Sequence, residues 1–174
     1  MISYKGQRYK ISNTKIKALC KSTLRTLGLD DAEFSLDISG DSRIKKLNSQ
    51  FRGKDKTTDV LSFPQWEWQN PIKLRSARKM KAVFFKKHLG DVVISLPQVE
   101  KNAINIGQTL DREFVFLLVH GLLHLCGHDH IMPSDEKIML KEQRLVIKAL
   151  ESAAVKKLWS GCVRIKGKAG FRKK

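Results

Sequence analysis

The chain has few of the features that mark secreted or membrane proteins. Its 174 residues include only three cysteines, Cys20, Cys126 and Cys162, an odd number at wide spacing. This usage is typical of free thiols in a reducing compartment rather than of a disulfide framework. No apolar run reaches the ~20 residues that span a bilayer, and the first residues lack the charged-then-apolar order of a signal peptide. We therefore expect a cytoplasmic protein that does not enter a membrane.

Acidic residues are also scarce: 17 aspartates and glutamates stand against 34 lysines and arginines, for a net charge of +17. So basic a balance in a small chain favours a polyanionic partner, most often nucleic acid. A merely solvated surface is the plainer alternative, although charge of one sign destabilises a folded protein by self-repulsion. An anionic membrane surface is a weaker alternative, because no clear basic amphipathic helix is evident in the sequence.

The pattern of apolar residues predicts short strands interspersed with helices, in a chain whose length suits one domain. Strands are expected near residues 9–11, 32–38, 59–63 and 91–95. Helices are expected over about 13–27, 41–51 and 97–106, from about 110, and from 134 onward. Asn13 and Ser134 are the expected caps of the first and last of these helices.

Two basic segments depart from this pattern. Residues 65–88 hold two tryptophans and a run of lysines and arginines, which predicts a long surface loop or arm. Residues 156–174 include eight basic residues and no acid, which predicts a mobile tail able to contact phosphates. The expected organisation is therefore a single domain over residues 1–155, with the arm inside it and the basic tail after it.

Four of the five histidines lie within residues 120–130. His120 and His124 are four residues apart, which on a helix places two imidazoles on one face, close enough to bind one zinc ion. Gly127 is the residue type that ends a helix in the left-handed conformation, so the chain can turn and bring His130 to the same metal. The plainer alternative is that these are histidines satisfied within the core. Three protein ligands leave one position open, as in catalytic zinc sites, where a bound water has a pKa near ~7.

The residues between these histidines indicate which reactions and which further metal ligands are less favoured. Gly121 stands where zinc proteases with a His-Glu-x-x-His motif carry their general base, which argues against peptide hydrolysis by that route. Cys126 is about 200° around the helix from His124, so we expect it in the core rather than at the metal. His128 is expected on the turn, with no ligand role.

Two further segments, together with the histidines, resemble the signature of the bacterial YbeY family. Residues 47–64 read LNSQFRGKDKTTDVLSFP and residues 89–95 read LGDVVIS, and the three blocks occur in the family's order. The resemblance implies a zinc-dependent, single-strand-specific endoribonuclease that acts on ribosomal RNA of the small subunit, in 16S rRNA 3′-end maturation and ribosome quality control. It also implies an α/β (α+β) fold, which we expect as a small mixed, mostly parallel four-stranded sheet covered by about five helices.

The resemblance also implies roles for particular side chains. By position, the family's three metal ligands correspond to His120, His124 and His130. Arg52 matches the arginine that lines the family's active-site cleft. A guanidinium binds phosphate oxygens through two parallel donors, so we expect Arg52 to neutralise charge in the transition state. The alternative for Arg52 is a surface ion pair with Asp55 or Asp59.

The remaining candidate residues lie near these positions in the sequence. Asp129 is expected to support a ligand histidine or transfer a proton, or else to cap its own loop. Trp66 and Trp68, with the basic arm, are expected to stack on unpaired bases, and the alternative is that they only pack the arm on the domain. Lys54 and Lys56, in a charged turn, are expected to contact RNA.

Three functions therefore remain open from the sequence. The first is a metal-dependent endoribonuclease, the second is a zinc hydrolase of another class such as a peptidase, and the third is a non-catalytic, zinc-containing assembly factor of the small ribosomal subunit. The chain also departs from the family's pattern. Position 128 is histidine where tyrosine is common, the segment between Pro64 and Leu89 is longer and more basic, and the basic tail is not a family feature.

Overall fold

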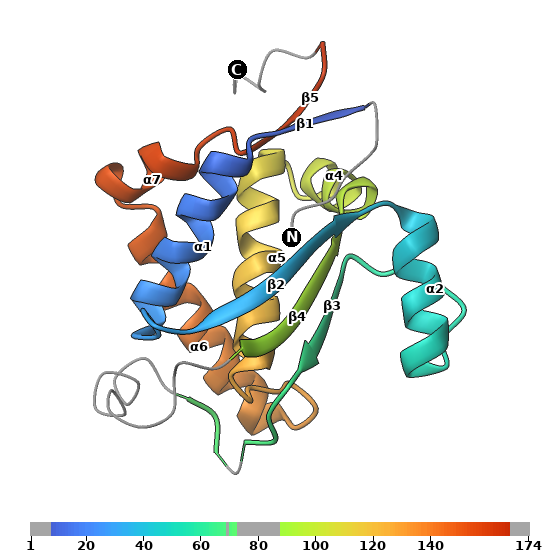
Figure 1. Ribbon diagram of the computed structural model, residues 1–174, viewed down its shortest axis with the longest axis vertical. Coiled ribbons are helices and arrows are strands. Elements are labelled where there is room, and N and C mark those ends of the chain that lie inside the picture. Colours follow the sequence, from blue (N-terminus) through green and yellow to red (C-terminus); the bar gives the residue numbers. More distant parts are fainter. Residues whose placement is uncertain (1–7, 69, 73–87, 168–174) are drawn as a thin grey trace.

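A three-stranded sheet is the scaffold on which most of the helices pack (Figure 1). The structure is a computed structural model, and it describes residues 8–68, 70–72 and 88–167. The strands are β2 (Glu33–Ser39), β3 (Val60–Pro64) and β4 (His88–Ser95), in the order β2-β4-β3. β4 runs parallel to β2 and antiparallel to β3. It is buried along most of its length, as expected of a central strand covered on both faces.

The helices within the described ranges cover the two faces of this sheet unequally. They are α1 (Asn13–Leu27), α2 (Asp41–Arg52), α4 (Leu96–Asn105), α5 (Leu110–Leu125), α6 (Pro133–Leu150) and α7 (Ala153–Trp159). The apolar α5 packs on β3 and β4, with α4 and α6 beside it and α1 against α6. α2 packs separately on the sheet, through Ile44 against Leu61 and Val93. None of the described helices is long and apolar enough to cross a membrane.

The two ends of the described chain meet in a separate two-stranded ribbon, at the top of Figure 1. Strand β1 (Tyr9–Ile11) pairs antiparallel with β5 (Val163–Ile165). Trp159, at the end of α7, is 2% exposed, and its indole N–H donates to the carbonyl of Leu150. Residues 156–167 of the expected basic tail therefore form helix, turn and strand packed on the domain, while residues 168–174 lie outside the described residues.

The expected α/β class and the single domain agree with the structure, whereas the expected sheet needs correction. Among the described residues the main sheet has three strands rather than the expected four, with one parallel and one antiparallel pair, and β1 lies in the ribbon. Alternation of apolar residues shows that a segment is extended, but not which partner it will find. The cap positions also differ by one or two residues, because Ser12 and Met132 precede the first turns of α1 and α6.

Gly90 allows β3 and β4 to approach closely at the end of their pairing. Its φ of 132° is a conformation that favours glycine, and it pairs with Pro64 in the antiparallel register. A Cβ at this position would lie 2.1 Å from the carbonyl oxygen of Phe63, so no larger residue fits without moving the backbone. The glycine in the segment 89–95 therefore helps to hold β3 beside α5.

Candidate metal centre

The three histidines expected as ligands come together at the C-terminal end of α5. His120 and His124 lie on that helix, and Gly127 ends it with a φ of 84°. The N–H of Gly127 donates to the carbonyl of His124, and the N–H of His128 donates to that of Leu123, which satisfies the last carbonyls of the helix. The chain then turns back and places the ring of His130 5.5 Å from that of His120 and 5.1 Å from that of His124, between centroids.

The ring nitrogens have the separation that a single metal ion requires. One nitrogen from each of His120, His124 and His130 lies within 4.8 Å of the others. The Nε2 atoms of His120 and His124 are 3.2 Å apart. Two nitrogens bound to one tetrahedral zinc at ~2.05 Å would lie about 3.3 Å apart. The donor set therefore fits a divalent transition metal, for which imidazole is a common ligand.

Burial keeps two of these imidazoles neutral. It lowers the pKa of His120, and it lowers the pKa of His124 to about 4. The positive charges that His120 and His130 would carry lower the pKa of His124 further, whereas a backbone hydrogen bond with His128 and the charge of Asp129 raise it. A metal ligand must present an unprotonated nitrogen, so this environment favours metal binding at neutral pH without a proton to displace.

A glutamine that the sequence did not single out orients His120. Gln143 of α6 is 1% exposed, and its amide N–H donates to the carbonyl of Phe116 over 3.2 Å. This bond directs the amide oxygen of Gln143 toward Nδ1 of His120, at 3.4 Å. Because an amide oxygen can only accept, Nδ1 carries the proton and Nε2 presents its lone pair to the metal position. The sequence offers one signal for this role: Gln143 is a polar residue at the helical spacing of the buried apolar residues of α6.

The structure explains the glycine at position 121 by packing, apart from the absence of a protease base there. It faces the sheet, where a Cβ would lie 2.8 Å from Cγ1 of Val92, 3.1 Å from Oγ of Ser62 and 3.4 Å from Cγ2 of Val60. The missing side chain lets α5 approach β3 and β4. A glutamate at this position would collide with the strands, so the position cannot supply the base of a protease without a different helix packing.

Arg52, the last residue of α2, reaches the strand that packs beside the metal helix. Its Nη2 donates to the carbonyl of Ser62 over 3.3 Å, and the side chain of Ser62 faces Gly121, next to His120. The guanidinium is otherwise exposed. Arg52 is therefore held to β3 by one bond and keeps donors for an anion.

Neither carboxylate considered as a partner for Arg52 binds it among the described residues. Asp55 pairs with Lys45 at 3.2 Å, and the Oδ2 of Asp59 accepts from Asn102 over 3.0 Å. Asp59 also accepts from the N–H of Val60, at the start of β3. The surface ion pair considered as the alternative role for Arg52 is thus not formed in this structure.

A buried side chain of α2 anchors the charged turn at residues 53–56. Asn48 is 3% exposed, and its amide donates to the carbonyl of Lys56 over 2.8 Å. The side chains of Lys54 and Lys56 are exposed at this turn. Their expected contact with RNA stays a prediction, but the anchored turn presents both lysines beside Arg52.

Comparison with known proteins identifies the family of this chain. A family model described as Endoribonuclease YbeY matches residues 1–151. The chain belongs to the YbeY family. It is 44% identical to an Endoribonuclease YbeY of Persephonella marina over 120 residues, which is 69% of this chain and 71% of that protein. It is 36% identical to an Endoribonuclease YbeY of Aquifex aeolicus over 150 residues, or 86% and 91% of the two chains.

A solved structure shares the fold of this chain. The solution structure of TM1509 from Thermotoga maritima superposes with a TM-score of 0.56 and 25% identity, covering 86% of this chain and 89% of that one. The YbeY match ends at residue 151, one residue after the end of α6. Helix α7 and strand β5 therefore lie beyond the part of the chain that the family model matches.

The two tryptophans of the expected arm pack on the YbeY domain near the end that carries the three histidines. The indole N–H of Trp68 donates to the carbonyl of Leu125 over 2.8 Å, and its ring lies against Gly127. Trp66 donates to the carbonyl of His88 over 2.9 Å and remains 38% exposed. Trp68 therefore packs on the domain, as the alternative role expected. The stacking of Trp66 and Trp68 on bases stays a prediction. Most of the basic arm, residues 73–87, lies outside the described residues.

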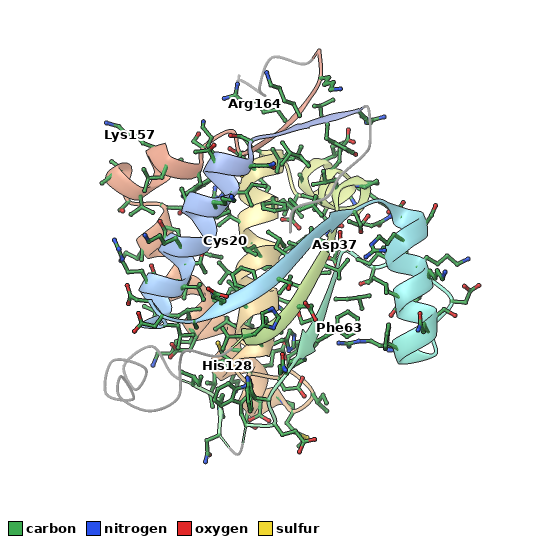
Figure 2. The ribbon with its side chains drawn as sticks, viewed as in Figure 1. Cys20, Asp37, Phe63, His128, Lys157 and Arg164 are labelled. Atoms are coloured by element: carbon green, nitrogen blue, oxygen red, sulfur yellow. The ribbon has the colours of Figure 1, made fainter. Side chains whose placement is uncertain are left out.

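His128 supports the same end of the domain and does not join the metal ligands. It is 3% exposed, and its Nε2–H donates to the carbonyl of Ile72 over 2.8 Å. The N–H of Ile72 in turn donates to the carbonyl of Cys126. Figure 2 shows His128 just beyond the lower end of α5. The histidine thereby ties the segment that leads into the arm to the turn that carries His130.

Asp129 and Cys126 occupy different environments beside the metal ligands. The carboxylate of Asp129 is exposed and accepts from the N–H of His130 over 2.7 Å, which is the contact expected of a loop cap. Its support of a histidine or role in proton transfer stays a prediction. Cys126 is fully buried in the core, and burial raises the pKa of its thiol to about 12, so it stays protonated.

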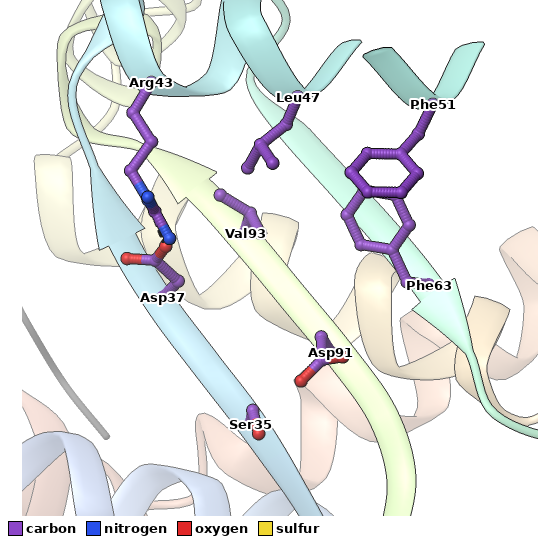
Figure 3. A pocket seen from close by; sticks show the side chains of 8 residues that line it. All are labelled: Ser35, Asp37, Arg43, Leu47, Phe51, Phe63, Asp91 and Val93. Atoms are coloured by element: carbon purple, nitrogen blue, oxygen red, sulfur yellow. Dashed lines mark hydrogen bonds and ion pairs between the residues drawn. The ribbon is translucent and has the colours of Figure 1, made fainter.

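A hollow of about 370 Å³ lies between α2 and the strands of the main sheet (Figure 3). The ion pair of Arg43 with Asp37, at 2.6 Å, closes one end, and the edge-to-face rings of Phe51 and Phe63, 5.2 Å apart, close the other. These contacts hold α2 on the sheet and so help to position Arg52. The residues lining the hollow are Ser35, Asp37, Arg43, Leu47, Phe51, Phe63, Asp91 and Val93.

Proposed function

We propose that this protein is a zinc-dependent endoribonuclease that hydrolyses single-stranded RNA, with small-subunit ribosomal RNA as its substrate. Its relatives are named endoribonucleases, which supports RNA as the substrate and hydrolysis as the reaction. The observation that carries the proposal is the cluster of His120, His124 and His130, whose nitrogens fit one metal ion and which lies within the residues that the family model matches. The charge of +17 suits a polyanionic substrate.

Zinc is the metal we propose for this site. Three neutral imidazoles and an open fourth position are the donor set of catalytic zinc. When bound, zinc supplies Lewis acidity, which lowers the pKa of water toward ~7 and polarises a phosphate oxygen. The protein's own part is to hold the three rings in place, with Gln143 fixing the tautomer of His120.

The neighbouring residues bind and orient the RNA in this proposal. Arg52 donates to non-bridging phosphate oxygens as their negative charge increases, and Lys54 and Lys56 bind adjacent phosphates. Trp66 and Trp68 stack on unpaired bases, with the larger exposed surface on Trp66. Asp129 accepts or donates a proton near the ligand histidines. The three free cysteines support a cytoplasmic location.

Metal analysis and RNA cleavage with purified variants test the function. We expect about one zinc per chain, cleavage of single-stranded but not duplex RNA, and loss of cleavage after chelation. His120→Ala should lose both metal and cleavage, whereas Arg52→Ala should keep the metal and lose ~100-fold or more in rate. Lys101→Ala, an exposed change on α4, is the matched control for contaminating nucleases.

The same variants separate the endoribonuclease from an assembly factor in which zinc serves only structure. If His120→Ala and Arg52→Ala cleave RNA at the rate of the unaltered chain after rigorous purification, the catalytic proposal is wrong. The ribosomal substrate is tested by supplying precursor 16S rRNA within small subunits. Cleavage near the 3′ end that depends on Arg52 supports the proposal, and cleavage at random positions contradicts it.

A further inference from the structure

Helix α6 carries a row of cations on its outer side that the metal centre does not use. Its inner side is buried through Met139, Gln143, Val146 and Leu150. Four exposed cations, which we name the α6 basic stripe, are Lys137, Lys141, Arg144 and Lys148. At 3.6 residues per turn they lie within about 60° of one another around the helix and extend over about 16 Å. The apolar residues of α6 are not confined to one side, so the pattern of apolar residues does not reveal this face.

The charges of this stripe are not neutralised by neighbouring acids. None of the ion pairs among the described residues includes one of the four cations. The acids of α6 project about 80° or more away from the stripe, at Asp135, Glu136 and Glu142. Cations held in a row at low mutual distance repel one another, so this arrangement lowers stability unless an anion binds.

Apolar side chains beside the stripe add a second kind of contact. Leu140 and Leu145 are 37% and 48% exposed and flank the cations. Together with Lys137, Lys141 and Arg144 they line a shallow hollow of about 330 Å³. Nucleobases stack on arginine guanidinium planes and can pack against apolar side chains, whereas phosphates bind lysines and arginines. Both halves of a nucleotide thus have a matching group on this face.

The position of α6 connects this face to the metal centre. Only two residues separate His130 from Pro133, the first residue of α6. Three extended residues and one helical turn place Lys137 within about 16 Å of His130. An anionic membrane fits this face less well, since the apolar side of α6 is buried in the domain and cannot enter lipid.

We propose that the α6 basic stripe binds the backbone of single-stranded RNA outside the cleavage centre, as an extended subsite for the strand that flanks the cut. This inference rests on the proposed RNA substrate. It explains why the outer side of α6 keeps four cations in line. The subsite adds affinity for long strands and leaves the chemistry at the metal unchanged.

The test compares two variants that each remove four positive charges from the same zinc-loaded protein. The first is K137Q/K141Q/R144Q/K148Q, and the control is K10Q/K17Q/K21Q/K101Q, at exposed lysines of β1, α1 and α4. Binding of a labelled single-stranded phosphorothioate RNA, which keeps its charge and resists hydrolysis, is measured by anisotropy over a range of salt. The stripe variant should lose ~tenfold or more in affinity, and its slope of log affinity against log salt should fall by ~3, as four lost phosphate contacts require.

The inference is overturned if both variants change affinity and slope equally, because the effect is then net charge alone. It is also overturned if the stripe variant loses binding to phosphatidylglycerol vesicles while it keeps RNA affinity. K137R/K141R/R144K/K148R retains the charges and should bind as the unaltered chain does, which separates charge from folding. If the unaltered chain does not cleave RNA, the proposed function is wrong. The dependence of RNA affinity on salt would still show whether the α6 basic stripe binds RNA.

Discussion

Gln143 holds the ring of His120 in one orientation without adding a charge to the metal centre. The bond to the Phe116 carbonyl determines which end of the amide faces the histidine. A carboxylate at this position would also accept from Nδ1, but it would add a negative charge beside the ligand. The side chain therefore acts through the histidine rather than on the substrate.

Replacement of Gln143 is expected to weaken metal binding. Gln143→Leu keeps much of the volume but removes the acceptor for Nδ1 of His120, so zinc affinity should fall ~10- to 100-fold. Gln143→Glu retains an acceptor and should bind zinc at least as tightly as Gln143→Leu does. Competition with a chromophoric chelator at neutral pH measures both. Gln98→Leu, whose amide bonds to Asp41 away from the site, is the control; equal zinc affinity in Gln143→Leu and the control would refute the role.

The depressed pKa of His124 predicts how stability of the metal-free protein depends on pH. The folded-state pKa is about 4, against an ordinary value of 6.5, because of burial. Between these values the unfolded chain binds the proton and the folded chain does not. The free energy of unfolding should therefore fall as pH decreases from about 6.5 toward 4.

Urea titrations at pH 7 and pH 5 in the presence of a chelator measure this dependence. His124→Asn removes the titrating group, so its stability should change less between the two pH values than that of the unaltered chain. Groups that do not interact with His124 titrate alike in both proteins and cancel in the comparison. The same pH dependence in both proteins would show that His124 is not responsible.

Among the helices and strands, the close packing of α5 on β3 and β4 depends on Gly121. Val92 and Ser62 occupy the space that a side chain would need. The approach brings the helix with the metal ligands next to the strand that holds Arg52. The candidate metal centre and Arg52, the residue proposed to bind phosphate, are thus joined by one helix–strand contact.

Gly121→Ala should destabilise the protein although alanine favours helices. The gain in helix propensity is up to ~1 kcal/mol, whereas overpacking a buried contact costs ~1–3 kcal/mol. The net change in the free energy of unfolding should be a loss of about 1–2 kcal/mol by urea denaturation. Gly40→Ala, at the N-cap of α2 where a Cβ would meet nothing within 4 Å, should cost less, about 1 kcal/mol at most. Stabilisation by Gly121→Ala would contradict the packing argument.

For the molecule as a whole, α7 and β5 contribute to the hydrophobic core although they lie beyond the family match. Trp159 and Cys162 are buried, and β5 pairs with β1 from the start of the described chain. The family match ends before these elements, at residue 151. Basic residues on their outer surface made this segment resemble a solvated tail in the sequence, although its apolar residues are in the core.

Trp159→Ala should therefore destabilise the whole domain. It removes a large buried side chain and its bond to the Leu150 carbonyl, a change that costs ~3–5 kcal/mol in a core. Chemical denaturation followed by circular dichroism measures the loss. Leu158→Ala, at a half-exposed position beside it, should cost much less. Equal stability of Trp159→Ala and the unaltered chain would show that α7 does not pack as described.

Much of the metal centre could be predicted from the sequence because its geometry is local. The four-residue spacing of His120 and His124 and the turn at Gly127 follow from helix periodicity and from the freedom of glycine. The nature of most elements also follows from apolar periodicity, as α1 (Asn13–Leu27) shows by ending where expected. The order of strands and the partner of β1 do not, because alternation carries no information on pairing.

The sequence by itself determined the histidine set, the free cysteines, the excess of positive charge and the family. Only the tertiary structure decided that Gln143 orients His120, that Arg52 binds Ser62 rather than a carboxylate, and that the last helix and strand join the core. It also decided that four cations of α6 share one exposed face. The reason is physical: spacing along one helix follows from its period, whereas a contact between distant segments depends on how they pack.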